Sequence, residues 1–211
     1  MPQTQPRRQR RKEARPAEIM AAGLKLFSGR GFAATRLEDV AEAAGVSKAT
    51  IYLYFDSKAE LFKAIVRDIA GARIGAAEGF IDGFEGSTVD LLTGLFRNLG
   101  DVAAVPEIRA LMKVVMSEAG NFPDIAAFYR DEVAFRGLRN MARIIERGIG
   151  RGEFRPCDPI ATAQSVIFPI IMNALAQEIF GPLPETNPGK FLAGHFEFIL
   201  RGLAADKEHR A

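Results

Sequence analysis

The stretch with the clearest capacity for chemistry runs from Val46 to Phe55 and contains no acidic residue. Its polar side chains are one lysine, two small hydroxyls and two phenols, on the side of a short helix that would face outward. A helix that faces only solvent usually mixes charges of both signs, so this composition favours a surface that meets phosphate groups. The residues expected on this surface are Ser47, Lys48, Ala49, Thr50, Tyr52 and Tyr54.

Two short helices joined by a tight turn would have to position that surface. Val40 and Ala41 lie on one face of the first helix, and Ile51 and Phe55 lie on one face of the second. Gly45 stands where the chain turns sharply and needs a positive φ. This spacing is that of a helix-turn-helix. A helical hairpin without any nucleic-acid role has the same apolar spacing, so the interpretation depends on the outward composition.

The flanking sequence supplies two more helices. Periodic apolar residues predict a helix from about residue 15 that ends near Gly29–Gly31. The pattern Thr35–Glu38 is a capping box that would begin the first short helix, and Ser57–Glu60 is a second one that would begin a longer helix. The sequence therefore predicts a compact helical domain over residues 15–63, preceded by a disordered basic arm at 1–14.

The rest of the chain, residues 64–211, also has helical periodicity, and strand alternation never lasts long enough to indicate a sheet. The starts at Asp158–Pro159 and Asn187–Pro188 are the clearest, because each pairs a capping side chain with proline at the first helical position. We therefore expect an all-α protein of about nine helices, with the later ones near residues 88–102, 106–118, 122–150, 158–180 and 188–203.

Charge is distributed unevenly along the chain. Residues 1–63 carry 12 Lys and Arg against 7 Asp and Glu, whereas the remainder carries 16 against 19. Between Arg7 and Arg15 there are six basic residues and one acid, so this arm could lie along a DNA backbone or minor groove. A solvated tail with only diffuse attraction explains the same composition equally well.

Several classes of protein are disfavoured by the residue inventory. The two histidines, His195 and His209, lie near the C-terminus, and no nucleophile elbow, P-loop or dinucleotide fingerprint occurs. We therefore expect no catalytic residue, metal site or cofactor. The single Cys157 fits a reducing compartment, and the longest apolar run, Val166–Met172, is too short to cross a bilayer. Without a signal peptide, these features predict a soluble cytoplasmic protein.

Residues 15–66 resemble the DNA-binding domain of the TetR/AcrR family of one-component transcriptional regulators. The resemblance rests on LFSGRGF (26–32), AGVSKATIYLYF (44–55) and SKAELF (57–62), in this order and spacing. Residues 116–129, MSEAGNFPDIAAFY, resemble a segment of the AcrR/AefR-like subgroup. Position 49 is often glycine in the family and is alanine here, which limits how closely the backbone approaches DNA.

The resemblance implies a double-stranded DNA operator as partner. It assigns Thr35, Arg36 and Lys58 to phosphate contacts, favoured by helix N-termini. Lys48, Thr50, Tyr52 and Tyr54 are then expected on or in the major groove, without an assigned base. Two alternatives stay open: Tyr52 could pack partly beneath the first helix, and Lys58 could be a solvated residue of a first helical turn.

The last two helices predict a homodimer. Residues 160–180 are apolar almost all round, so this helix must be buried on more than one side. We expect a twofold bundle of four helices, two from each chain, which is also the usual dimer of the family. A purely internal core is the alternative. The expected interface residues are Ile167, Ile171, Leu175, His195, Phe196 and Ile199.

The resemblance further implies a repressor that a small apolar or amphipathic molecule releases from a pseudo-palindromic operator. A pair of methionines one helical turn apart offers an adaptable lining for such a molecule, although plain core is the commoner role at this spacing. A regulator or architectural factor without any small-molecule effector is the alternative function. The candidate pocket residues are Phe96, Met112, Met116, Phe128, Met141, Asn173 and Gln177.

Overall fold

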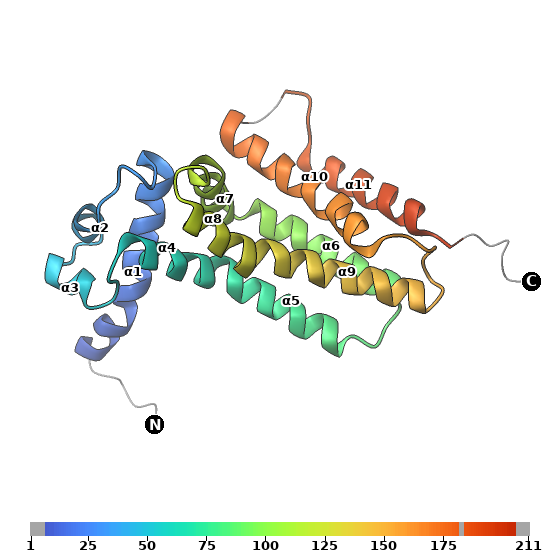
Figure 1. Ribbon diagram of the computed structural model, residues 1–211, viewed down its shortest axis with the longest axis horizontal. Coiled ribbons are helices and arrows are strands. Elements are labelled where there is room, and N and C mark those ends of the chain that lie inside the picture. The colour runs from blue at the N-terminus through green and yellow to red at the C-terminus, as the bar shows by residue number, and fades with distance from the viewer. Residues whose placement is uncertain (1–6, 182–183, 206–211) are drawn as a thin grey trace, which may run out of the picture. The chain divides into compact units, whose positions relative to one another are not determined.

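The computed structural model describes residues 7–181 and 184–205. Over these residues the chain is helical and contains no β-strand, as predicted (Figure 1). Two π-helical turns, η1 and η2, each join a pair of α-helices end to end, so the described residues form nine continuous helices. The elements are α1 (Arg7–Arg30), α2 (Leu37–Ala43), α3 (Lys48–Tyr52), α4 (Lys58–Val66), η1 (Arg67–Gly71), α5 (Ala72–Gly83), α6 (Thr88–Ala104), α7 (Pro106–Glu118), α8 (Pro123–Tyr129), η2 (Arg130–Ala134), α9 (Phe135–Gly150), α10 (Pro159–Phe180) and α11 (Pro188–Leu203).

The chain forms two compact units. The N-terminal unit comprises Met1–Ile69 and Ala110–Tyr129, and the C-terminal unit comprises Ala70–Arg109 and Arg130–Ala211. Most of α7 and all of α8 therefore belong with α1–α4, although they follow residue 64 in the sequence. The domain boundary expected between residues 63 and 64 stays a prediction. In the structure, the segment Ala110–Tyr129 also belongs to the first unit.

Aromatic packing holds the N-terminal unit together. The rings of Phe27, Phe32 and Phe62 lie 5.1 to 6.3 Å apart between centroids. Phe122, from the segment between α7 and α8, joins them edge-on at 4.9 Å from Phe32. Gly23 allows α1 and α4 to approach closely, because a Cβ there would lie 3.0 Å from a methyl group of Leu61. Helices α2 and α3, which present the outward surface, are therefore supported by a packed aromatic core.

Three helix starts follow the predicted capping chemistry. The side chains of Ser57, Asp158 and Asn187 each accept a hydrogen bond from the backbone N–H three residues later, at 3.2, 2.8 and 3.0 Å. Proline occupies the first turn after both Asp158 and Asn187, where its missing N–H costs nothing. These three helix starts are therefore confirmed. They could be predicted from the sequence because each depends only on adjacent residues.

The expected disordered arm is wrong over residues 7–14, because α1 begins at Arg7. This segment is rich in Arg, Lys, Glu, Ala and Gln, which have high helix propensity, and it precedes a long periodic helix to which it adds turns. Residues 1–6 of that arm lie outside the described residues. The single helix expected over 122–150 is continuous from Pro123 to Gly150, with a π-helical turn at η2 (Arg130–Ala134).

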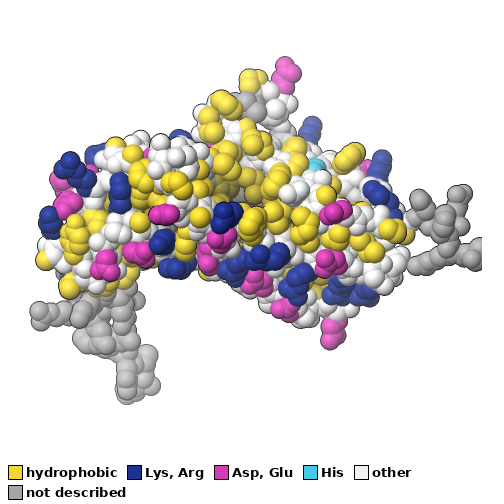
Figure 2. Space-filling view, viewed as in Figure 1, with side chains coloured by type: hydrophobic (Ala, Val, Ile, Leu, Met, Phe, Trp, Pro, Cys, Tyr) yellow, Lys and Arg dark blue, Asp and Glu magenta, His cyan; other side chains and the backbone are white. Residues whose placement is uncertain are grey.

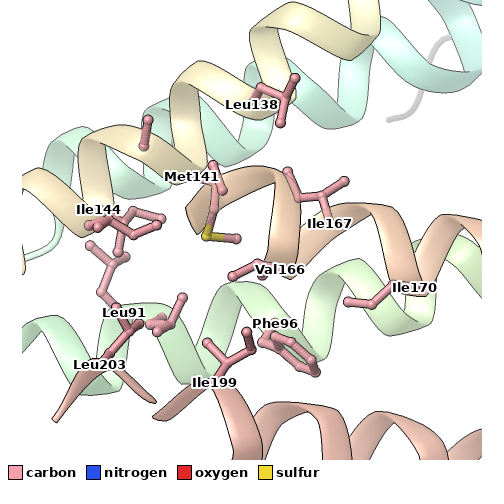
Figure 3. Packing of buried hydrophobic residues seen from close by; sticks show 14 of the residues in the cluster. Leu91, Phe96, Leu138, Met141, Ile144, Val166, Ile167, Ile170, Ile199 and Leu203 are labelled. Atoms are coloured by element: carbon pink, nitrogen blue, oxygen red, sulfur yellow. The ribbon is translucent and has the colours of Figure 1, made fainter. Parts of the chain in front are cut away.

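The C-terminal unit is a bundle of α5, α6, α9, α10 and α11. Helix α9 packs against α5, α6 and α10, and α10 packs against α6 and α11. Buried side chains from all five of these helices meet in one cluster, part of which Figure 3 shows. Those labelled in the figure are Leu91, Phe96, Leu138, Met141, Ile144, Val166, Ile167, Ile170, Ile199 and Leu203.

Among the described residues, α10 is long and apolar enough to cross a membrane by length and composition alone. The helix of 22 residues exceeds the uninterrupted apolar run seen in the sequence, because a few polar residues and the single charged residue Glu178 interrupt it without lowering its mean hydropathy much. One such helix is weak evidence for a membrane span, since the core helix of a globular domain passes the same test. Val166, Ile170 and Ala174 of α10 are buried in the C-terminal unit.

Candidate nucleic-acid interface

Helices α2 and α3 form the predicted helix-turn-helix. Gly45 has a φ of +65°, as its position in the turn requires. The N–H of Val46 donates to the carbonyl of Ala41 at 2.9 Å, which closes the turn. Ser47 begins α3, because its Oγ accepts from the N–H of Thr50 at 3.1 Å. Ile51 is fully buried, so the opposite side of α3 faces outward.

The outward surface of α3 presents a cation, small polar groups and a phenol. The side chain of Lys48 is 69% exposed, and Tyr52 is exposed as well. Ser47 and Ala49 are also exposed, whereas Thr50 and Tyr54 are half-buried. The Thr50 hydroxyl lies 2.8 Å from Ser47 Oγ, so part of its hydrogen-bonding capacity is used within the turn. The six predicted residues therefore share one exposed end of the N-terminal unit.

A carboxylate from α2 joins this surface. Lys48 Nζ lies 2.8 Å from Glu38 Oε1, and the Tyr52 hydroxyl donates to the same oxygen at 3.1 Å. Lys48 Nζ is also 5.9 Å from the centre of the Tyr52 ring. Glu38 was not among the predicted site residues. Its position in the first turn of α2, ten residues before the lysine, gave no local signal of this contact.

The hydrogen bond from Lys48 lowers the pKa of Glu38 from its ordinary value of 4.5 to about 2. The Tyr52 hydroxyl adds to this effect because it also donates to the ionised carboxylate. The same pairing raises the pKa of Lys48. Near neutral pH the pair is therefore fully ionised, and its two charges cancel at the start of α3.

Thr35 does not cap α2 as predicted, whereas the phosphate contacts expected of Thr35 and Arg36 stay predictions. The helix is capped one residue later than expected: Asp39 Oδ2 accepts from the N–H of Arg36 at 3.0 Å. Thr35 is only 1% exposed, and its hydroxyl donates to the carbonyl of Gly31 at 2.8 Å. Its side chain closes the loop between α1 and α2 and does not face outward, whereas Arg36 is exposed.

Lys58 also makes contacts other than the predicted ones. Its Nζ donates to three backbone carbonyls of the loop between α1 and α2, at 2.7, 3.0 and 3.2 Å. The same nitrogen lies over the rings of Phe32 and Phe122, at 4.6 and 5.6 Å from their centres. Desolvation lowers the pKa of Lys58. In this structure Lys58 therefore binds the loop between α1 and α2 and is not freely solvated, and its contact with a phosphate stays a prediction.

Leu53 is an exposed apolar residue that sequence reasoning missed. It is 82% exposed at the end of α3, directly after Tyr52. An apolar side chain on a helix-turn-helix can contact the methyl group of thymine. The sequence did contain a signal of this exposure. Leu53 lies two residues from both inward positions, Ile51 and Phe55, and residues two apart on a helix point in nearly opposite directions.

A pocket of about 200 Å³ opens within the C-terminal unit, between α6, α10 and α11. Asn173 and Gln177 both line it, and Gln177 Nε2 donates to Asn173 Oδ1 at 2.8 Å. Arg109 lines it too, but its charge is balanced by Glu178, whose Oε2 lies 3.5 Å from the guanidinium Nε. The remaining walls are mainly apolar, with Phe191 among them.

The other predicted pocket residues do not gather there. Phe96 is buried against the Phe196 ring, 4.7 Å between centres, and Met141 lines a smaller pocket of about 90 Å³ beside α5, α6 and α9. The remaining three predicted pocket residues belong to the N-terminal unit and have different environments. Met112 is buried, Met116 is exposed, and Phe128 lies beneath two cationic side chains. Spacing along single helices could not show which helices enclose a cavity.

The predicted dimer residues are mostly inside the C-terminal unit. Ile167, Leu175 and Ile199 are buried there, and His195, with its ring nitrogen 3.0 Å from the Val166 carbonyl, is half-buried. Ile171 and Phe196 are half-buried and pack against the core cluster. Other apolar side chains of the same helices are exposed, and Figure 2 shows hydrophobic atoms over the C-terminal part of α10. These exposed residues are Ile160, Phe168, Met172, Ile179, Phe180 and Phe198.

No group of three or more His, Cys, Asp or Glu residues within the described part of the chain is placed to hold a metal ion. Cys157 is half-buried and free. Neither the pockets nor the outward surface of α3, as far as the described residues go, provides a recognisable donor set for a metal.

Two family models match the chain. Residues 19–65 match the model of bacterial regulatory proteins of the tetR family, and residues 85–186 match the model of the tetracyclin repressor-like C-terminal domain. The first range contains the whole helix-turn-helix, and the second contains the pocket-forming parts of α6 and α10. Together the two models cover more than half of the chain.

Curated relatives are regulators as well. The chain is 28% identical over 173 residues to the uncharacterized HTH-type transcriptional regulator YfiR of Bacillus subtilis, and the match covers 78% of this chain and 82% of that protein. It is also 28% identical over 144 residues to the HTH-type transcriptional repressor KstR2 of Mycolicibacterium smegmatis, with 68% and 69% covered. These names describe regulators, and the chain is not an enzyme.

Solved structures share the fold. A tetR-family regulatory protein from Rhodococcus RHA1 has a TM-score of 0.67 at 23% identity, covering 91% of this chain and 98% of that one. The fatty acid degradation regulator FadR of Bacillus halodurans has a TM-score of 0.67 at 15% identity, covering 88% and 94%. With the motif in α2 and α3 and both family models in agreement, the chain belongs to the TetR family of DNA-binding transcriptional regulators.

Proposed function

We propose that this chain represses transcription by binding a pseudo-palindromic operator through α3, and that a small molecule releases it. Regulators of this family bind DNA operators and act as dimers. The observation that carries the proposal is the outward surface of α3, where Lys48, Tyr52 and Leu53 are exposed side by side on a rigid helical mount. Such a surface is suited to the major groove, with cytoplasmic DNA as its target.

A second copy of the chain would cover the exposed apolar face of α10 and α11. Phe168 and Met172 lie one turn apart on α10 and are about half exposed, and Phe198 of α11 is 74% exposed. Large exposed apolar side chains on adjacent helices mark an interaction surface. An isologous pairing would present two α3 helices to two half-sites, which tight sequence-specific binding requires. The proposed interface is thus shifted outward from the buried residues that the sequence suggested.

The effector would bind in the pocket between α6, α10 and α11. Its apolar walls, with Asn173 and Gln177 as hydrogen-bonding groups, suit a small amphipathic molecule. The Asn173–Gln177 hydrogen bond leaves one amide donor group and one carbonyl oxygen of the pair for a ligand. Binding would release the operator if it favours a dimer whose two α3 helices are spaced incorrectly for the half-sites.

Selection of duplexes from a random library by the purified full-length protein tests the DNA-binding part. We expect an enriched pseudo-palindrome, with protection of two half-sites about one helical turn apart. Failure to enrich any sequence at low salt, or protection of a single half-site by a monomer, would contradict the proposal.

The alternative, a regulator without an effector, requires a separate experiment. A small-molecule screen would record the thermal stability of the protein first and release of the selected duplex second. A ligand-released repressor should give compounds that do both, and Asn173→Leu with Gln177→Leu should abolish their effect while leaving DNA binding unchanged. Compounds that stabilise the protein without releasing DNA would favour the alternative.

A further inference from the structure

Glu38 interrupts the cationic surface that the sequence predicted for α3. A single oxygen of its carboxylate accepts from Lys48 Nζ at 2.8 Å and from the Tyr52 hydroxyl at 3.1 Å. Glu38 stands on α2, so the contact ties the outward surface of α3 to the preceding helix. Both partners, Lys48 and Tyr52, are among the residues expected to contact DNA. Neither contact is needed to stabilise the turn, because hydrogen bonds of Ser47 and Val46 already close it.

The contact removes the free charge at the start of α3. Lys48 is the one Lys or Arg between Arg36 and Lys58 in the sequence, and Lys58 is engaged by loop carbonyls. When Glu38 holds Lys48, residues 47–54 therefore have no uncompensated lysine or arginine charge of their own, although Arg15 of α1 lines a hollow together with Ser47 and Thr50. Sequence-independent affinity for DNA depends on the number of phosphates neutralised by such cations. A paired Lys48 contributes little to that number.

The contact also fixes the directions of two long side chains. Lys48 and Tyr52 are one turn apart on α3, and the ammonium group lies 5.9 Å from the centre of the ring. Because one oxygen holds both donors, the lysine cannot range freely over the surface to reach any nearby phosphate. Base edges in the major groove demand donors in defined positions, whereas phosphates accept a cation from many directions.

We propose that Glu38 is a positioning residue that raises the sequence specificity of the regulator. It holds Lys48 and Tyr52 in the arrangement used at the operator, and it withholds the Lys48 charge from phosphates of unrelated DNA. The proposal rests on the function proposed above, because it presupposes that the outward surface of α3 binds the major groove.

Glu38→Gln tests this with two duplexes of equal length: the sequence selected from a random library and a scrambled version of it. The substituted amide would still accept from Tyr52 but would not hold the lysine charge. We expect binding to the scrambled duplex to tighten at least about fivefold to tenfold at about 0.1 M salt. The salt slope should be steeper by about 1.8, as one added phosphate contact from each of the two α3 helices of the proposed dimer predicts. Affinity for the selected duplex should change by less than about twofold, so the ratio of the two affinities should fall.

Glu42→Gln is the matched control, since Glu42 is an exposed acid in the same helix and its loss changes the net charge equally. We expect it to leave the salt slope on the scrambled duplex unchanged. In the double variant Glu38→Gln with Lys48→Ala, the added affinity for scrambled DNA should disappear. Thermal melting verifies that each variant is folded.

Three results would overturn the inference: an unchanged salt slope in Glu38→Gln, the same change in Glu42→Gln, or equal tightening on both duplexes. They are distinguishable from failure of the proposed function. In the latter case the unmodified protein itself would select no duplex, whereas here it would bind normally and only the role of Glu38 would be wrong.

Discussion

The two units of the molecule differ in how directly their surfaces follow from sequence. In the N-terminal unit, the predicted outward residues of α3 and its ends all lie between Ser47 and Tyr54, and one turn of helix decides which are buried. In the C-terminal unit, the pocket is assembled mainly from α6, α10 and α11, which are spread over residues 88–203 of the chain. Short-range geometry suffices for the first kind of site, whereas the second depends on how a bundle packs.

The difference extends to what apolar residues mean in each unit. Near α3, apolar residues at helical spacing belong to the core. The exposed Leu53 is an exception, and its position between Ile51 and Phe55 explains why it points outward. In α10, apolar residues occupy both the buried and the exposed sides, so spacing alone cannot separate core from interface. An all-round apolar helix indicates burial on two sides without saying which side a partner covers.

The largest predicted effect links the two units. Phe168→Glu combined with Met172→Glu places two charges on the exposed face of α10 and should separate the proposed dimer into monomers. Operator affinity should then fall more than about a hundredfold, because one α3 helix reads only one half-site. Sedimentation velocity and titration of the selected duplex measure the two effects.

Phe135→Glu is the control for this prediction, since Phe135 is a similarly exposed aromatic residue on α9 of the same unit. It should leave both the oligomeric state and the affinity unchanged. A double variant on α10 that stays dimeric would place the interface elsewhere and would restore the buried-residue alternative.

Lys48→Ala should have the next largest effect, confined to DNA binding. Its side chain is 69% exposed, so folding should be unaffected. Loss of a groove contact costs roughly 1–3 kcal/mol, which corresponds to about fivefold to 150-fold weaker binding of the selected duplex. Fluorescence anisotropy at several salt concentrations measures this, with thermal melting as the control. An unchanged affinity would remove α3 from the interface.

Lys58→Ala should act in the opposite way, on stability. Three loop carbonyls would lose the donor that now reaches them, and unsatisfied, partly buried carbonyls cost about 1–3 kcal/mol. We expect the N-terminal unit to unfold at lower denaturant concentration, and the salt slope of DNA binding to stay within error of the unmodified protein. A reduced slope without destabilisation would instead support the phosphate contact predicted from the resemblance.

These two lysines also indicate what the sequence could and could not predict. Lys48 was correctly expected on the exposed surface because its neighbours fix the register of α3. The loop contacts of Lys58 could not be predicted, because its acceptors belong to a loop about 25 residues earlier that is brought near by the packing of Phe32 and Phe62. Helix class, turn and caps follow from adjacent residues, whereas contacts between helices require the folded core.

Leu53→Ala should give a smaller loss, about threefold to fivefold in affinity for the selected duplex. The expected cause is loss of apolar contact, so the salt slope should stay the same, in contrast to Lys48→Ala. Replacing thymine by uracil at successive positions of the duplex would locate the contact, because the protein should lose affinity at one equivalent position in each half-site. If the unmodified protein loses affinity at no position, Leu53 lies outside the groove.

The smallest predicted effect is on the acid titration of Glu38 in the N-terminal unit, with Glu78 of the C-terminal unit as the comparison. Because Lys48 lowers the pKa of Glu38 from 4.5 to about 2, the folded state binds fewer protons than the unfolded state in this interval. The contribution of the pair to stability is therefore fully present above pH 4.5 and is lost as the pH falls toward about 2, although solvent screening keeps it small.

Carboxyl carbon shifts measured by NMR follow each glutamate separately. Lys48→Ala should raise the Glu38 midpoint from about 2 toward 4.5, since Lys48 is the largest cause of the shift. It should not move Glu78 of the C-terminal unit, whose pKa is lowered by hydrogen bonds from Arg136 at 2.8 and 3.1 Å. If Glu38 titrates at its ordinary value in the unmodified protein while Glu78 stays low, the Glu38–Lys48 pair does not persist in solution, and α3 offers a free lysine to any DNA.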